Sequence, residues 1–95
     1  MSTEDLDARK RRIRFRATHR GMKELDILFG RLAREVLDDL DEAGVSAFER
    51  LLEVPDIEVL SWVSGTAPVP EDYRSFLTDR LLTYRFDVAD YENGT

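Results

Sequence analysis

The segment from His19 to Asp26 holds the residues of this chain that are best suited to contacting another molecule. Gly21 stands between two cations, Arg20 and Lys23, and Glu24 follows one helical turn after Arg20. Because glycine has no side chain, another protein's backbone could approach closely there. Free amides at a helix start and the fork of arginine donors suit carboxylates, phosphates or exposed carbonyls. The group therefore predicts a docking surface, with Glu24 pairing with a basic group on the partner.

The same residues also fit a purely structural role. On a continuous helix, Arg20 and Glu24 would pair at a spacing of four, contributing about 0.2–0.5 kcal/mol. Glu24 also suits the first turn of a helix, where it would satisfy backbone amides. Gly21 would then be no more than a hinge between helices. The residues by themselves leave both interpretations open.

Catalytic and metal-binding chemistry finds little support in the composition. The chain has no cysteine, which excludes thiolate nucleophiles and thiolate metal sites. His19 is its one histidine, so a catalytic dyad or metal site that needs two histidines cannot form. The core of a 95-residue chain leaves little room for a ligand pocket, which typically has a volume of about 300–1,000 Å³. We therefore predict a binding protein that is not an enzyme, with no catalytic residue, no metal site and no stably bound cofactor.

Basic residues are concentrated near the N-terminus of an otherwise acidic chain. The net charge is −6, yet eight of the fourteen Lys and Arg residues lie between positions 9 and 23. An arginine-rich helix neutralises phosphates, so the alternative function is a nucleic-acid- or ribosome-associated protein that binds through Arg9–Arg16. The acidic remainder, and Phe15 as the one interleaved aromatic, favour a solvated or protein-docking face. A toxin–antitoxin partner or cytoskeletal regulator would share the small helical form, but no residue pattern supports either.

The elements that must position these residues are all predicted to be helices, because no long stretch alternates with period two. Apolar residues recur at spacings of three and four, most clearly from Leu25 to Leu40. Trp62 is expected in the core or at its rim. Asp41 and Asp56 are candidate N-caps, and Gly65 is a candidate helix end. The predicted helices cover residues 6–18, 22–40, 42–53, 56–64 and 71–85, with a break at 19–21.

This pattern predicts an all-α fold, a compact five-helix bundle. Residues 1–8 are expected to be a flexible acidic N-terminus, residues 9–86 one helical domain, and residues 87–95 a flexible polar tail. No apolar run approaches the roughly 18 residues that span a bilayer, and the first seven residues resemble no targeting peptide. We therefore expect a soluble, cytoplasmic, bacterial monomer.

The segment from His19 to Asp26 resembles the Arg-Gly-x-x-Glu signature of the FAD assembly factors of succinate dehydrogenase. The resemblance extends from about Arg11 to Tyr84. It includes the basic first helix and three further stretches: Phe48–Glu53, Pro55-Asp56 with Leu60-x-Trp62, and Gly65-x-x-Pro68. The motif is short, but its order, chain size and helical layout are specific.

The resemblance implies a small helical chaperone that binds the flavoprotein subunit of succinate dehydrogenase and, in bacteria, the related fumarate reductase subunit. It would promote the covalent attachment of FAD to a histidine of that subunit, a reaction that the flavoprotein itself catalyses. Arg20, Gly21 and Glu24 match the positions that face the flavoprotein, and Met22, Lys23 and Asp26 are adjacent matches. His19 is assigned no chemistry. The resulting hypothesis is that the basic end docks into the flavoprotein's domain cleft, where Arg20 reaches polar or acidic groups.

Overall fold

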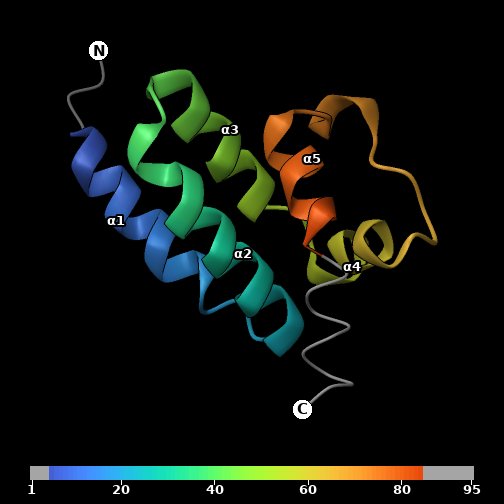
Figure 1. Cartoon of the computed structure of the whole chain (residues 1–95). Coiled ribbons are helices and arrows are strands. Elements are labelled where there is room, and N and C mark those ends of the chain that lie inside the picture. Colours follow the sequence, from blue (N-terminus) through green and yellow to red (C-terminus); the bar gives the residue numbers. More distant parts are fainter. Residues whose placement is uncertain (1–4, 85–95) are drawn as a thin grey trace.

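The computed structural model describes residues 5–84, which fold into five α-helices and two short 3₁₀ helices with no strand between them (Figure 1). The prediction of an all-α five-helix bundle is thus confirmed. The proposed flexible tails fall largely outside the described residues. The elements are α1 (Leu6–Ala17), α2 (Lys23–Val36), η1 (Leu37–Asp39), α3 (Glu42–Leu52), α4 (Asp56–Ser64), η2 (Glu71–Tyr73) and α5 (Phe76–Thr83).

Helix α2 is the centre of the bundle. It packs against α1 on one side and against α5 on the other, while α1 also packs against α3 and α4 against α5 (Figure 1). Its apolar stripe is fully buried, and each such side chain stabilises the fold by about 1.5–3 kcal/mol. Helix α1 contributes a narrower stripe, as its sparse apolar residues predicted. The buried side chains include Leu25, Leu28, Phe29 and Leu32 from α2, with Ile13 and Ala17 from α1 and Trp62 from α4.

The second helix is shorter than predicted. It was expected to run from residue 22 to 40, but the α-helix ends at Val36 and a 3₁₀ turn, Leu37–Asp39, follows. Acidic side chains are unfavourable at the negative end of a helix, and Asp38 and Asp39 occupy that end. The turn keeps Leu37 fully buried and allows Asp41 to begin α3. There the Asp41 carboxylate accepts a hydrogen bond from the Gly44 amide at 2.9 Å, which confirms it as the N-cap.

The start of α4 differs from the prediction in a way that concerns the candidate site. Asp56 was expected to cap this helix, but Pro55 occupies the N-cap position and no side chain caps it. Asp56 is instead the first helical residue, and its carboxylate accepts a hydrogen bond from Arg20. A tertiary ion pair has therefore replaced the local cap. The other end matches the prediction, since Gly65 ends the helix with φ of +85°.

The predicted fifth helix, residues 71–85, is interrupted. Residues 71–73 form a 3₁₀ turn, Arg74 and Ser75 are extended, and α5 begins at Phe76. The reason is a reciprocal cap: the Leu77 amide donates to Ser75 Oγ at 3.1 Å, and the Ser75 amide donates to Thr78 Oγ1 at 3.0 Å. The new start places Phe76 at the surface, where it is 53% exposed. No helix among residues 5–84 is long and apolar enough to cross a membrane.

Candidate docking site

The loop between α1 and α2 places Gly21 on open surface. Its φ is +102°, a conformation that side-chain-bearing residues rarely adopt. Apart from Gly21 and its two chain neighbours, no residue has an atom within 4 Å of the point where a Cβ would stand. Gly21 is therefore required by the backbone, and it also leaves a bare patch that another protein can approach.

Arg20 anchors this loop to the rest of the bundle. Its side chain is 7% exposed, and its guanidinium donates to Asp56 Oδ1 through Nε at 2.8 Å. Two further donors reach main-chain carbonyls at the end of α3: Nη1 donates to Leu52 O at 3.1 Å, and Nη2 to Val54 O at 2.7 Å. The guanidinium also lies over the Phe29 ring, 4.6 Å from its centroid. One side chain thus joins the loop to α2, α3 and α4.

This geometry corrects one interpretation of Arg20. It does not pair with Glu24, because the chain between them is not a continuous helix and Asp56 takes the guanidinium instead. Its guanidinium is largely buried and bonded inside the bundle, and contact between Arg20 and a partner stays a prediction. The sequence could not reveal this, since Asp56 lies 36 residues further along the chain.

Asp26 supports the loop from the other side. Its Oδ1 accepts a hydrogen bond from the Arg20 amide at 2.7 Å, which ties the loop to the first turn of α2. Met22, the residue before α2, is half-buried and packs against the core. Arg20, Met22 and Asp26 therefore lie beneath the loop and hold it in place.

The remaining candidate residues face outward. Lys23 is exposed and Glu24 is half-buried in the first turn of α2. Within residues 5–84, neither side chain forms a hydrogen bond or an ion pair, so both are available to a partner. The six candidates thus divide into an outward set, Gly21, Lys23 and Glu24, and a supporting set, Arg20, Met22 and Asp26. Whether these six bind a partner stays a prediction.

A groove that sequence reasoning missed lies beside the loop. Its volume is about 370 Å³, and one wall is the Phe15 ring stacked on the His19 imidazole, with centroids 3.9 Å apart and planes 13° apart. His19 Nδ1 is 2.7 Å from the Phe15 carbonyl oxygen. Because a carbonyl only accepts hydrogen bonds, Nδ1 must carry the proton. The residues that line the groove are Phe15, Arg16, His19, Arg20, Leu52, Val54, Pro55 and Asp56.

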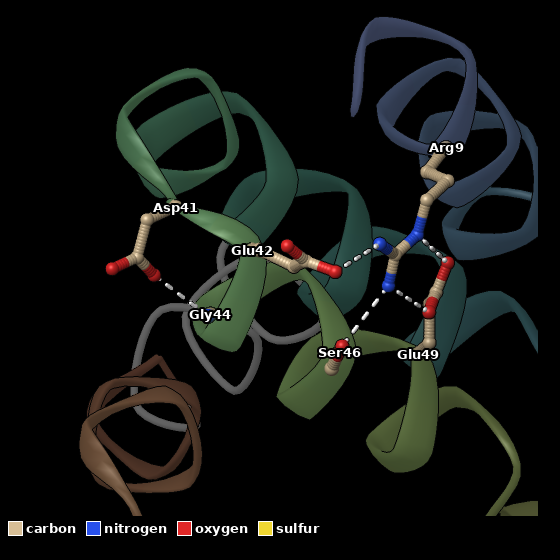
Figure 2. Close-up of polar contacts among 6 residues, drawn as sticks. All are labelled: Arg9, Asp41, Glu42, Gly44, Ser46 and Glu49. Atoms are coloured by element: carbon tan, nitrogen blue, oxygen red, sulfur yellow. Dashed lines mark hydrogen bonds and ion pairs between the residues drawn. The ribbon is translucent and has the colours of Figure 1, made fainter. Parts of the chain in front are cut away.

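Arg9, the first residue of the basic run, holds α1 against α3. Figure 2 shows Arg9 reaching across to α3, where its guanidinium donates to both carboxylate oxygens of Glu49, at 2.8 and 3.1 Å. Arg9 also donates to Ser46 Oγ at 3.0 Å and lies 3.7 Å from Glu42 Oε2. Its side chain is only 12% exposed.

Other cations of the run are also paired. Arg14 forms an ion pair with Asp38, and Lys10 donates to the carbonyl of the same residue at 2.9 Å. Arg16 pairs with Glu53 at 2.9 Å. These contacts weaken the nucleic-acid alternative, because the carboxylates already neutralise cations that phosphates would need. Among residues 5–84, no group of three metal-ligating side chains gathers.

The amino-acid sequence is similar to one protein family and to several of its known members. A family model for Sdh5, described as the flavinator of succinate dehydrogenase, matches residues 11–85. The FAD assembly factor SdhE of Acetobacter pasteurianus is 35% identical over 86% of this chain and 75% of its own length. The mitochondrial succinate dehydrogenase assembly factor 2 of Danio rerio is 31% identical over 85% of this chain. Its counterpart in Schizosaccharomyces pombe is 31% identical over 78%. The chain spans about half the length of these two mitochondrial proteins, 52% and 53%.

Proposed function

The chain belongs to the Sdh5 family of succinate dehydrogenase flavinators, and on this premise we propose that it binds the flavoprotein subunit of succinate dehydrogenase. In this proposal it promotes the covalent attachment of FAD to that subunit. The related subunit of fumarate reductase is the second candidate partner. The chain itself acts as a chaperone and holds no FAD.

The observation that carries this proposal is the exposed Gly21 on a loop that is fixed from below. A docking surface that is already ordered loses little conformational entropy on binding, so more of the contact energy appears as affinity. The Arg20 side chain and the Asp26 carboxylate supply that order through contacts inside the bundle. The open space over Gly21 lets the partner's main chain approach the loop.

The outward side chains give the docking surface its direction. Lys23 and Glu24 are adjacent residues of opposite charge, and neither is paired within residues 5–84. A partner surface of matching polarity would align with them, which favours one orientation and one set of partners. A chaperone of this kind acts by binding one conformation of its partner more tightly than the others. The flavoprotein supplies the reacting groups, and this chain selects the arrangement in which they meet.

The polar groups around the groove support a binding role over a catalytic one. Arg20 and Asp56 are bonded to each other, and the proton on His19 Nδ1 is directed to a main-chain carbonyl. No nucleophile lies beside a base among the residues that line the groove. In this proposal the site contacts the partner, and the reacting groups belong to the flavoprotein.

Covalent flavin in the partner provides the test. We would co-express the flavoprotein subunit with this chain in a host that lacks its own assembly factor, and measure in-gel flavin fluorescence after denaturation. The wild-type chain should restore covalent flavin, while Gly21→Arg and Glu24→Ala should reduce it strongly. Asp79→Ala is the matched control, because Asp79 is an exposed acid in the first turn of α5. Full covalent flavin without the chain, or with both site variants, would refute the proposal.

A further inference from the structure

Phe15 is an exposed aromatic residue in the middle of the basic helix. Its side chain is 62% exposed, the largest exposure of any aromatic residue among positions 5–84. The ring separates two hollows: the groove of about 370 Å³, and a second hollow of about 410 Å³ lined by Ala8, Arg11, Arg12, Phe15 and Arg16. Aromatic residues flanked by hollows and arginines are typical of protein interfaces. We call Arg11, Arg12, Phe15, Arg16 and His19 the Phe15 face.

The Phe15 ring is held in a fixed orientation. It stacks on His19, whose own ring is fixed by the contact between Nδ1 and the Phe15 carbonyl oxygen, 2.7 Å apart. The Thr18 hydroxyl lies 3.1 Å from the same nitrogen. An aromatic side chain that is already ordered binds with little entropic cost. The stack therefore provides an anchor that is ready for a partner.

The groove beside Phe15 offers apolar surface to the partner. Its lining includes the exposed residues Phe15 and Pro55, and the largely buried Leu52 and Val54, 6% and 4% exposed. Its volume, about 370 Å³, is enough for one or two side chains. Phe15 and Pro55 are the exposed apolar residues of the lining, and Arg16 and His19 are its exposed polar ones, so the groove fits an apolar side chain that projects from a polar segment.

The charges of the Phe15 face indicate which residues surround the apolar side chain in the partner segment. Arg11 is exposed and forms no ion pair within residues 5–84, and Arg16 is 42% exposed although it pairs with Glu53, so the matching segment carries carboxylates. A phosphate backbone fits less well, because Lys10 and Arg14 of the same helix are already bonded to Asp38 and leave few cations for a row of phosphates. The single aromatic also differs from the repeated stacking platforms that bind single-stranded nucleic acid. The observations therefore favour a protein segment.

We propose that the Phe15 face is a second contact with the flavoprotein, where it binds an acidic segment whose apolar side chain enters the groove. This inference rests on the proposed function. It extends the docking surface from the Gly21 loop along α1, because His19 belongs to the face and lies two residues before Gly21. The two contacts together would fix the partner at two points and so define its orientation.

The test is a titration of the purified flavoprotein subunit with variants of this chain, in which isothermal calorimetry measures the affinity of each variant. Phe15→Ala and Arg11→Glu should each lower the affinity by about tenfold. Phe76→Ala is the matched control, because Phe76 is also exposed, at 53%, but lies on a different helix. The affinity of this variant for the flavoprotein should equal that of the wild type. Because Phe15 and Arg11 are exposed, circular dichroism should show unchanged unfolding midpoints.

The outcomes separate this inference from the proposed function. If Phe15→Ala and Arg11→Glu bind like the wild type while Gly21→Arg does not, the inference is overturned and the proposed function stands. If the wild-type chain fails to bind the flavoprotein, both are overturned. If Arg11→Glu loses binding to a single-stranded RNA probe but keeps its affinity for the flavoprotein, the face belongs to nucleic acid and the inference is overturned.

Discussion

Arg9 and Arg20 both tie other parts of the chain to α3 or to the residues that follow it, but they do so with different partners. Arg9 binds side chains, chiefly the Glu49 carboxylate, across the interface between α1 and α3 (Figure 2). Arg20 binds the main-chain carbonyls of Leu52 and Val54, where α3 ends, and only one carboxylate. Both guanidiniums are largely buried, at 12% and 7% exposed.

The two arginines differ in whether their hydrogen-bond acceptors can find another donor when the arginine is removed. Carboxylate side chains near the surface can turn toward water, so the loss of Arg9 leaves few unsatisfied groups. The carbonyls at the end of a helix have no intrahelical donor and cannot move away. Removal of Arg20 would leave these acceptors and the Asp56 carboxylate without their donor. Arg20 is therefore expected to be the more important of the two, both for stability and for the position of Gly21.

The largest expected effect is that of Arg20→Ala, which should lower the free energy of unfolding by about 3 kcal/mol. Arg20→Lys should recover only part of this loss, because one ammonium group cannot replace a fork that serves three acceptors. Urea denaturation followed by circular dichroism measures both. A loss below that of Arg9→Ala would contradict the comparison.

A smaller effect is expected for Arg9→Ala, about 1 kcal/mol. Its partners, Glu42 and Glu49, have side chains 72% and 31% exposed and so regain water when the guanidinium is lost. A double-mutant cycle with Glu49→Ala in the same denaturation assay isolates the pair. A coupling energy close to the loss expected for Arg20→Ala would contradict this account. It would show that the exposure of the partner side chains does not determine how much stability is lost with the arginine.

The smallest effect is expected at a third arginine cluster, which joins α2 to α5 through Glu35. The Tyr84 hydroxyl donates to Glu35 at 2.6 Å and Arg31 donates at 3.0 Å, and these hydrogen bonds lower the pKa of Glu35 from 4.5 to about 2. Above pH 4.5 the carboxylate is ionised in both folded and unfolded states, and the cluster contributes fully. As the pH falls from 4.5 to 2, the unfolded chain takes up a proton before the folded one does, so this contribution is lost.

The pH dependence of stability tests that cluster. The difference in unfolding midpoint between the wild type and Glu35→Gln should be largest near neutral pH and should shrink between pH 4.5 and 2. Main-chain carbonyls such as those bound by Arg20 have no proton to gain in this range. A difference that stays constant down to pH 2 would contradict the assigned role of Glu35.

The fold was largely predictable from local patterns in the sequence. The apolar spacing of α2 and the capping chemistry of Asp41 and Gly65 depend on near neighbours, and each was confirmed. The errors arose where distant residues override a local rule. Asp56 was expected to cap α4 but is bonded to Arg20, and the predicted fifth helix is divided by the cap at Ser75.

The site was predictable only in part, for the same reason. The sequence predicted a partner-binding group of six residues between Arg20 and Asp26, and the structure places three of them, Gly21, Lys23 and Glu24, at the surface or near it. It did not indicate that Arg20 and Asp26 support the loop, because Arg20 finds its partners 32 to 36 residues away. The groove beside Phe15 was also missed, since it forms only when α1 meets the junction of α3 and α4.

The most direct test of the docking site compares Gly21→Ala with Gly21→Arg. Both variants strain the backbone equally at φ of +102°, but only arginine fills the open space above the loop. Titration of the purified flavoprotein subunit should therefore show an affinity for Gly21→Ala close to that of the wild type. For Gly21→Arg we expect a loss of about 100-fold. Equal affinities for the two variants would contradict docking at this loop.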